Sequence, residues 1–117
     1  MEVFAAILTI LLAVMCAASA VADFTMATPV VEAVDRLGLS RQIIPLCGIS
    51  KACGAVGLLI GFGNDSLRLF AAAATTAYFV CAVAVHARRR DTPANTAPAA
   101  VFLAVATVTL VATIVVV

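Results

Sequence analysis

The sequence predicts an all-α membrane protein: a four-transmembrane-helix bundle with a short interfacial helix in the first loop. Two observations support this fold class. The 117-residue chain is 65% hydrophobic and only 11% charged, with a mean hydropathy of +1.21, whereas soluble domains carry about 25% charged residues. The chain also contains apolar runs of about 20 residues, the length that crosses a hydrocarbon core of about 30 Å as a helix. A soluble domain of this size could not bury so much apolar surface, so we expect lipid to be the solvent.

The apolar runs organise the chain as a single transmembrane domain, residues 1–117. We expect spans at about residues 3–22, 43–63, 67–87 and 98–117. Helices are expected because a membrane span must satisfy its backbone hydrogen bonds internally. The first run contains Ala18-Ser19-Ala20, which resembles a signal-peptide cleavage site. However, Glu2 precedes the run and no basic residue does, so we interpret the run as a retained span.

Basic residues are concentrated in the first and third loops, residues 23–42 and 88–97, which share one side of a four-span chain. The basic residues in these two loops are Arg36, Arg41, Arg88, Arg89 and Arg90. The opposite side carries only Arg68. The positive-inside rule places the basic loops in the cytoplasm. We therefore expect a multi-pass protein of the cell membrane with both termini outside.

The first loop contains the signals of a short helix. Thr28 suits its N-cap, Pro29 its first turn and Gly38 its exit. One apolar stripe would run along this helix, made of Val30, Val31, Val34 and Leu37. Two interpretations account for the stripe equally well. The helix lies at the membrane interface, or its valines pack on the end of the bundle.

A polar pocket is predicted in the cytoplasmic half of the bundle, around Lys51 in the second span. A charge at such depth costs at least about 2.5 kcal/mol and usually faces a cavity; the alternative is a lysine that snorkels to the headgroups. Asp23 ends the first span and His86 ends the third, close to Arg88 and Asp91. His86 is interpreted first as a cap for helix-end carbonyls. The candidate pocket comprises these five residues.

Small residues follow one face of the second span. This face includes Ser50, Gly54, Gly57 and Gly61. Gly57 and Gly61 form a G-x-x-x-G pair, which permits close contact between helices. Packing within the bundle is the favoured interpretation, and homodimerisation through the same face is the alternative.

No motif for a metal, a cofactor or a nucleic acid is evident. The cysteines form no C-x-x-C pair and are interpreted as small hydrophobic residues: Cys16, Cys47, Cys53 and Cys81. The chain has no zinc-ligand spacing, no phosphate-binding loop and no basic–aromatic array. We expect no metal and no nucleic-acid partner, and the sequence leaves contact with a quinone open. No catalytic residue is identified, so we do not expect an enzyme that acts on its own.

The order of several segments resembles the DoxX-like family of short four-helix bacterial membrane proteins. These segments are Leu37-Gly38-Leu39-Ser40, Pro45-Leu46, Lys51 to Gly61, His86 to Asp91, and Pro98-Ala99. Asp23 stands where many relatives have a lysine. The resemblance implies a small membrane subunit or scaffold in the lipid bilayer, either as a homo-oligomer or with a membrane protein partner. Some relatives look like subunits of oxidoreductase assemblies that handle thiosulfate and quinone or oxidative stress.

Two other functions are considered. A transporter of small solutes, either anions or weak acids, would use Lys51. A cation exporter of the small multidrug type is disfavoured, because such exporters rely on a glutamate inside the first span and this span has no acid. An enzyme would use a pocket of Lys51, His86, Asp23 and Asp91, since perturbed titratable groups cluster at catalytic sites.

Overall fold

The computed structural model describes residues 1–117 and consists of helices, four of which are long and apolar enough to cross a membrane. The predicted fold class is therefore confirmed. In chain order the helices are α1 (Glu2–Phe24), α2 (Thr28–Arg36), α3 (Ile43–Ile60), the 3₁₀ turn η1 (Gly61–Gly63), α4 (Asp65–Arg88) and α5 (Pro93–Val116). The molecule measures 40 × 25 × 18 Å. Its long axis suits a bilayer of about 40–45 Å including headgroups.

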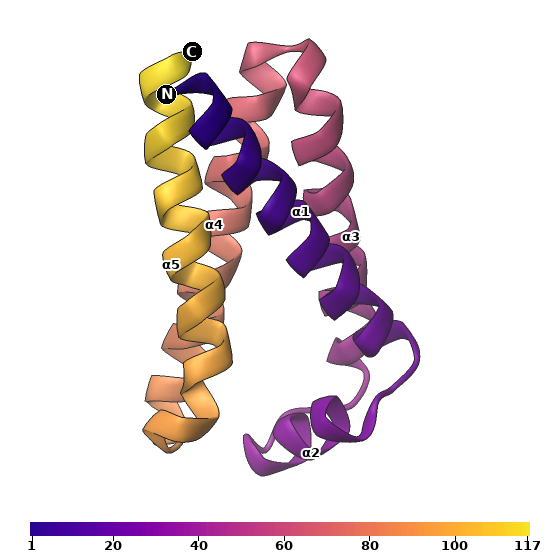
Figure 1. Ribbon diagram of the computed structural model, residues 1–117. Helices are drawn as coiled ribbons and strands as arrows, with labels where there is room; N and C mark the ends of the chain where they lie inside the picture. The colour runs from indigo at the N-terminus through magenta and orange to yellow at the C-terminus, as the bar shows by residue number, and fades with distance from the viewer.

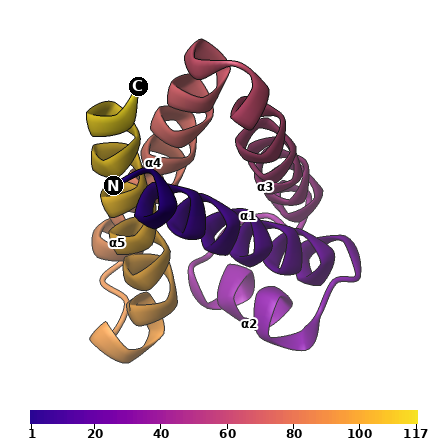
Figure 2. The same ribbon diagram turned by 45° about the horizontal axis from the view of Figure 1, so that its top comes forward.

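The two termini and η1 lie at one end of the bundle, which we call the terminal end (Figure 1). The opposite end, which we call the loop end, carries α2 and the connection between α4 and α5 (Figures 1 and 2). The first and third loops thus lie together, as four spans require. Helix α1 crosses the bundle obliquely: it is close to α5 at the terminal end and close to α3 at the loop end.

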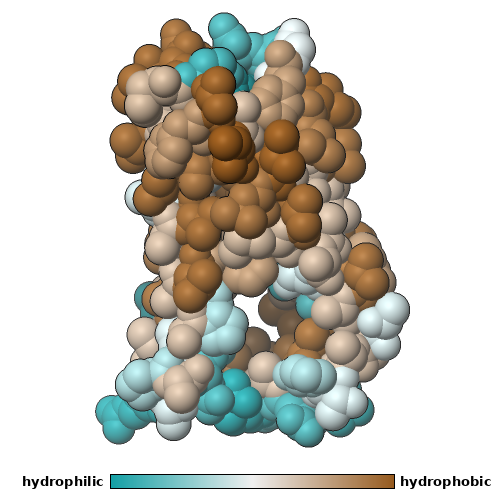
Figure 3. All heavy atoms as spheres, viewed as in Figure 1, coloured by the Kyte–Doolittle hydropathy of each residue, from teal (hydrophilic) through white to brown (hydrophobic).

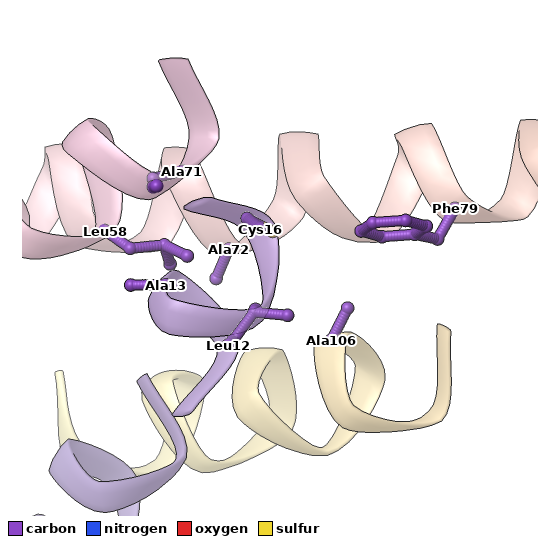
Figure 4. Close-up of a cluster of buried hydrophobic side chains, with 9 residues drawn as sticks. Leu12, Ala13, Cys16, Leu58, Ala71, Ala72, Phe79 and Ala106 are labelled. Atoms are coloured by element: carbon purple, nitrogen blue, oxygen red, sulfur yellow. The ribbon is translucent and has the colours of Figure 1, made fainter. Parts of the chain in front are cut away.

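The buried core lies where α1, α3, α4 and α5 meet, and small side chains dominate it (Figure 4). Its members are Leu12, Ala13, Cys16, Ala55, Leu58, Ala71, Ala72, Phe79 and Ala106. Alanines let helix backbones approach closely, which is how helices associate in a medium as apolar as their own side chains. Phe79 is the largest member, and its ring stacks on Phe102 of α5 with centroids 4.8 Å apart.

Helix α2 starts at a different cap from the one the sequence suggested. Ala27 occupies the N-cap, and no side chain caps the helix, so the prediction that Thr28 is the N-cap is wrong. Thr28 is instead the first helical residue, with Pro29 beside it. Gly38 has φ +73°, which confirms it as the residue where the chain turns out of the helix. Leu37 is buried and the valines of the stripe are half-buried, so both interpretations of the stripe stay open.

Helix α5 begins five residues before the predicted span. The Thr92 hydroxyl accepts a hydrogen bond from the Asn95 amide, and Pro93 occupies the first turn. Because this first turn is polar, hydropathy does not include it in the predicted span, although it belongs to the same helix. Pro98 consequently lies inside α5 and does not open it. Asn64 caps α4 in the same way, with its side chain accepting from the Leu67 amide.

Candidate functional site

Lys51 points from α3 toward α1, where it forms an ion pair inside the bundle. Its Nζ donates to Asp23 Oδ2 at 2.9 Å and to Ser19 Oγ at 2.8 Å. Ser19 and Asp23 are four residues apart and therefore lie on the same face of α1. The Lys51 side chain is 13% exposed and that of Asp23 only 3%. Lys51 is thus cavity-facing and does not snorkel to the headgroups.

A glycine on α3 makes this ion pair sterically possible. A Cβ on Gly48 would lie 3.0 Å from the Phe24 ring and 3.2 Å from Asp23 Cβ. The missing side chain lets the end of α1 approach α3 closely enough for Asp23 to reach Lys51. The depth of Lys51 and Asp23 in the sequence predicts their pairing, but no pattern singles out Gly48, which lies outside the predicted small-residue face.

Tyr78 of α4 lies on the other side of Lys51. Its ring centroid is 5.9 Å from Lys51 Nζ, within the range of a cation–π contact. Tyr78 is not among the residues predicted for the site. Tyr78 is the only tyrosine of the chain and lies in the middle of an otherwise alanine-rich span. Those two facts could have singled it out.

A second polar cluster surrounds Asp91 at the loop end. Its carboxylate accepts two hydrogen bonds from Arg36, at 3.1 and 3.2 Å, and lies 2.7 Å from His86 Nδ1. Asn95 Nδ2 and the Thr92 amide also donate to it, at 3.2 and 2.9 Å. The Arg36 guanidinium, followed by His86 and these donors, holds the pKa of Asp91 well below its usual range.

The structure therefore distributes the five predicted pocket residues over two clusters and the surface. Lys51 joins Asp23, and His86 joins Asp91 and not a helix-end carbonyl. Arg88 is exposed and contacts neither cluster. Arg36 takes part in the Asp91 cluster, although from the sequence it was expected only as a charge of the first loop.

A cavity of about 470 Å³ at the loop end connects the two clusters. All five α-helices contribute to its wall, and 15 of its 22 lining residues are hydrophobic. Its polar lining comes mainly from Ser19, Asp23, Lys51, His86 and Asn95. The cavity therefore has apolar walls with polar groups on its inner side and at its loop end, the arrangement typical of small-molecule sites.

The three glycines of the predicted small-residue face, which lie in α3 and η1, pack on α4 within the bundle. A Cβ on Gly61 would lie 2.6 Å from Arg68 Cα, and a Cβ on Gly57 would lie 3.2 Å from Ala71 Cβ. Gly54 contacts Thr75 of α4 in the same way. Ser50 is exposed and lines a groove between α3 and α4, also of about 470 Å³.

The structure contains no disulfide and no metal-binding group of side chains. All four cysteines are free thiols, and Cys16 and Cys81 both line the groove between α3 and α4. No group of three or more His, Cys, Asp or Glu side chains is arranged to hold a metal ion.

Comparison with known proteins places the chain in a family. The sequence profile of the DoxX-like family matches residues 7–109, which include both polar clusters and the lining of the cavity. The chain belongs to the DoxX-like family. This confirms the resemblance noted from the sequence, and with the four apolar helices it identifies a DoxX-like integral membrane protein. No curated protein matches the chain, and no solved structure does.

Proposed function

We propose that this DoxX-like protein is a small membrane subunit that binds an amphipathic molecule in the cavity at its loop end and serves a membrane oxidoreductase system. The cavity carries the binding part of the proposal, and membership of the DoxX-like family motivates the subunit part. The cavity joins mostly hydrophobic walls to an inward-facing Lys51 and to His86. Such a site suits a molecule with a long apolar part and a compact polar head.

The donors around the cavity support recognition of an oxygen-bearing head. A lysine ammonium has three N–H donors, and the Ser19 and Asp23 contacts use two of them. The third is free to donate to a ligand. The Asn95 side chain, on α5, also lines the cavity. These groups line one cavity, so a single ligand can contact both ends of the polar lining.

Co-purification tests the subunit role. A tagged chain, solubilised in mild detergent and chemically cross-linked, is expected to carry a stoichiometric oxidoreductase polypeptide that mass spectrometry identifies. A tagged Arg41→Gln variant, which loses only an exposed ion pair with Asp35, serves as the matched control. It should carry the same partner. Recovery of a partnerless homo-oligomer in several detergents would overturn the assignment.

Transport of an anion or weak acid is the second candidate function. Lys51 and Tyr78 line both the cavity and the groove between α3 and α4, so the same two residues face two hollows. A carrier of this kind would exchange Asp23 for the solute as the partner of Lys51. Lys51→Met should then abolish uptake of a labelled weak acid into loaded vesicles, and unchanged flux would remove this function.

A further inference from the structure

The cavity has its mouth on the side of the bundle. Near the terminal end α1 and α5 are in contact, with the Thr109 hydroxyl 3.5 Å from the Leu8 carbonyl oxygen. Toward the loop end the two helices diverge (Figure 1). Figure 3 shows the resulting opening in the side of the molecule, below a largely apolar surface and above the polar loop end.

The lining of this mouth reaches the depth of the hydrocarbon core. Pro98, Ala99 and Phe102 of α5 line the cavity opposite Val30 and Val34 of α2. Phe102 lies nine residues after the start of α5, which is about 14 Å along the helix at 1.5 Å per residue. The cavity therefore extends from the headgroup region into the acyl-chain region of one leaflet.

The water-facing end of the same cavity is bridged. Helix α2 lies at this end, and Arg36 in its last turn pairs with Asp91 in the connection between α4 and α5. Leu37, directly after α2, is only 7% exposed and lines the cavity. A ligand thus meets a polar bridge from the water side and an apolar opening from the lipid side.

Every strong charge in the cavity lining or beside it already has a partner. Lys51 is paired with Asp23, and Asp91 with Arg36. An anionic head placed next to Lys51 would lie beside the Asp23 carboxylate, which is 2% exposed and cannot be screened by water. The unpaired arginines of the loop end are exposed, and they are Arg88, Arg89 and Arg90. These arginines attract anionic headgroups to the surface of the protein, outside the cavity.

We propose that the cavity takes its ligand from the bilayer through the mouth between α1 and α5, and that it selects lipid-soluble molecules whose head is neutral and accepts hydrogen bonds. The ligand's oxygen accepts the remaining N–H of Lys51, and its apolar chain passes Phe102 into the leaflet. The inference rests on the binding function proposed above and defines the class of ligand and its route.

Photolabelling in phosphatidylcholine vesicles tests this inference. Three probes carry the same diazirine-bearing C16 chain and differ only in the head: a methyl ester, the free carboxylate, and no polar head. We expect the ester to label cavity peptides about ten-fold more than the headless probe, as one hydrogen bond to a charged donor implies. The carboxylate should label them no better than the headless probe. Equal labelling by ester and carboxylate would overturn the selectivity.

The route is tested by closing the mouth. Ala99→Trp places an indole in the cavity lining and should remove ester labelling of the cavity. Ala104→Trp is the matched control on the lipid-exposed part of α5, outside both hollows, and should leave labelling unchanged. Gel filtration checks that both variants fold. Full labelling of a monodisperse Ala99→Trp variant, or equal labelling of the cavity by a water-soluble C4 ester, would overturn lateral access.

These outcomes are separate from that of the co-purification experiment. Selective labelling of a partnerless chain would support the ligand class and overturn only the subunit role. A stoichiometric partner with no selective labelling would support the subunit role and overturn the proposed ligand class.

Discussion

The ion pair between Lys51 and Asp23 should contribute strongly to stability, because both groups are removed from water. Removing one partner of a buried ion pair typically costs about 3–5 kcal/mol, since the other charge is left uncompensated. Lys51→Met leaves a carboxylate whose side chain is 3% exposed, whereas Asp23→Asn leaves an ammonium that is 13% exposed and lines a cavity. We therefore expect Lys51→Met to cost about 3 kcal/mol of unfolding free energy and Asp23→Asn to cost less.

A double-mutant cycle distinguishes the ion pair from mere loss of packing. The combined variant carries no charge at either position, so it should be more stable than the sum of the two single losses predicts, with a coupling of about 1–3 kcal/mol. Reversible unfolding by SDS in mixed micelles, followed by far-ultraviolet circular dichroism, measures all four proteins. The exposed pair of Asp35 and Arg41 provides the control and should show no measurable coupling. Single variants within about 0.5 kcal/mol of the unsubstituted protein, the range of ordinary surface changes, would refute the reasoning.

Two further predictions concern helix contact and pH. Gly61→Ala should destabilise the bundle by about 1–3 kcal/mol, as overpacking does, because the new Cβ would lie 2.6 Å from Arg68 Cα; Gly63→Ala, where the space is open, should be close to neutral in the same SDS titration. Because Arg36 lowers the pKa of Asp91 in the folded protein, their pair stabilises above the unfolded carboxyl pKa of about 3.9 and is lost as pH falls below it. The melting temperature should therefore drop progressively as pH falls from about 5 toward the lowered pKa of Asp91, and Arg36→Gln should flatten that drop; an unchanged profile in the variant would contradict this origin.

The spans were predictable because the free energy of transfer into lipid depends on composition and length, which the sequence states directly. The bounds of α2 and α5 were not, because they depend on single caps. Thr92 supplies a side-chain cap and adds a polar turn to α5, whereas Thr28 supplies none and Ala27 takes its place. Hydropathy does not show whether a threonine at the start of a helix caps it.

The depth of the candidate site was also predictable, but its partners were not. Counting residues places Lys51, Asp23 and His86 in the same half of the bundle. The rotation of each helix about its axis decides which of them touch, and that rotation depends on packing between helices. Arg68 is the clearest miss. From the sequence it counts only as a charge on the side opposite the basic loops, yet it is only 4% exposed, pairs with Glu2 at 2.8 Å and lies over the Phe62 ring.

Gly48 on α3 and Gly61 in η1 allow close helix contact near the two ends of the bundle. Gly48 lets α1 approach, so that Asp23 reaches Lys51, and Gly61 accommodates the backbone of α4 at Arg68. Since Arg68 pairs with Glu2, ion pairs hold α1 near both of its ends.

Helix α5 has no comparable restraint, because its residues 93–116 include no charged side chain. Contacts with its neighbours hold it, including the stacking of Phe102 on Phe79 and the hydrogen bond of Asn95 to Asp91. The first half of α5 forms one wall of the mouth, and no ion pair made by its own residues holds it. When a ligand enters, we therefore expect this wall to move, while α1 and its ion pair with Lys51 stay in place.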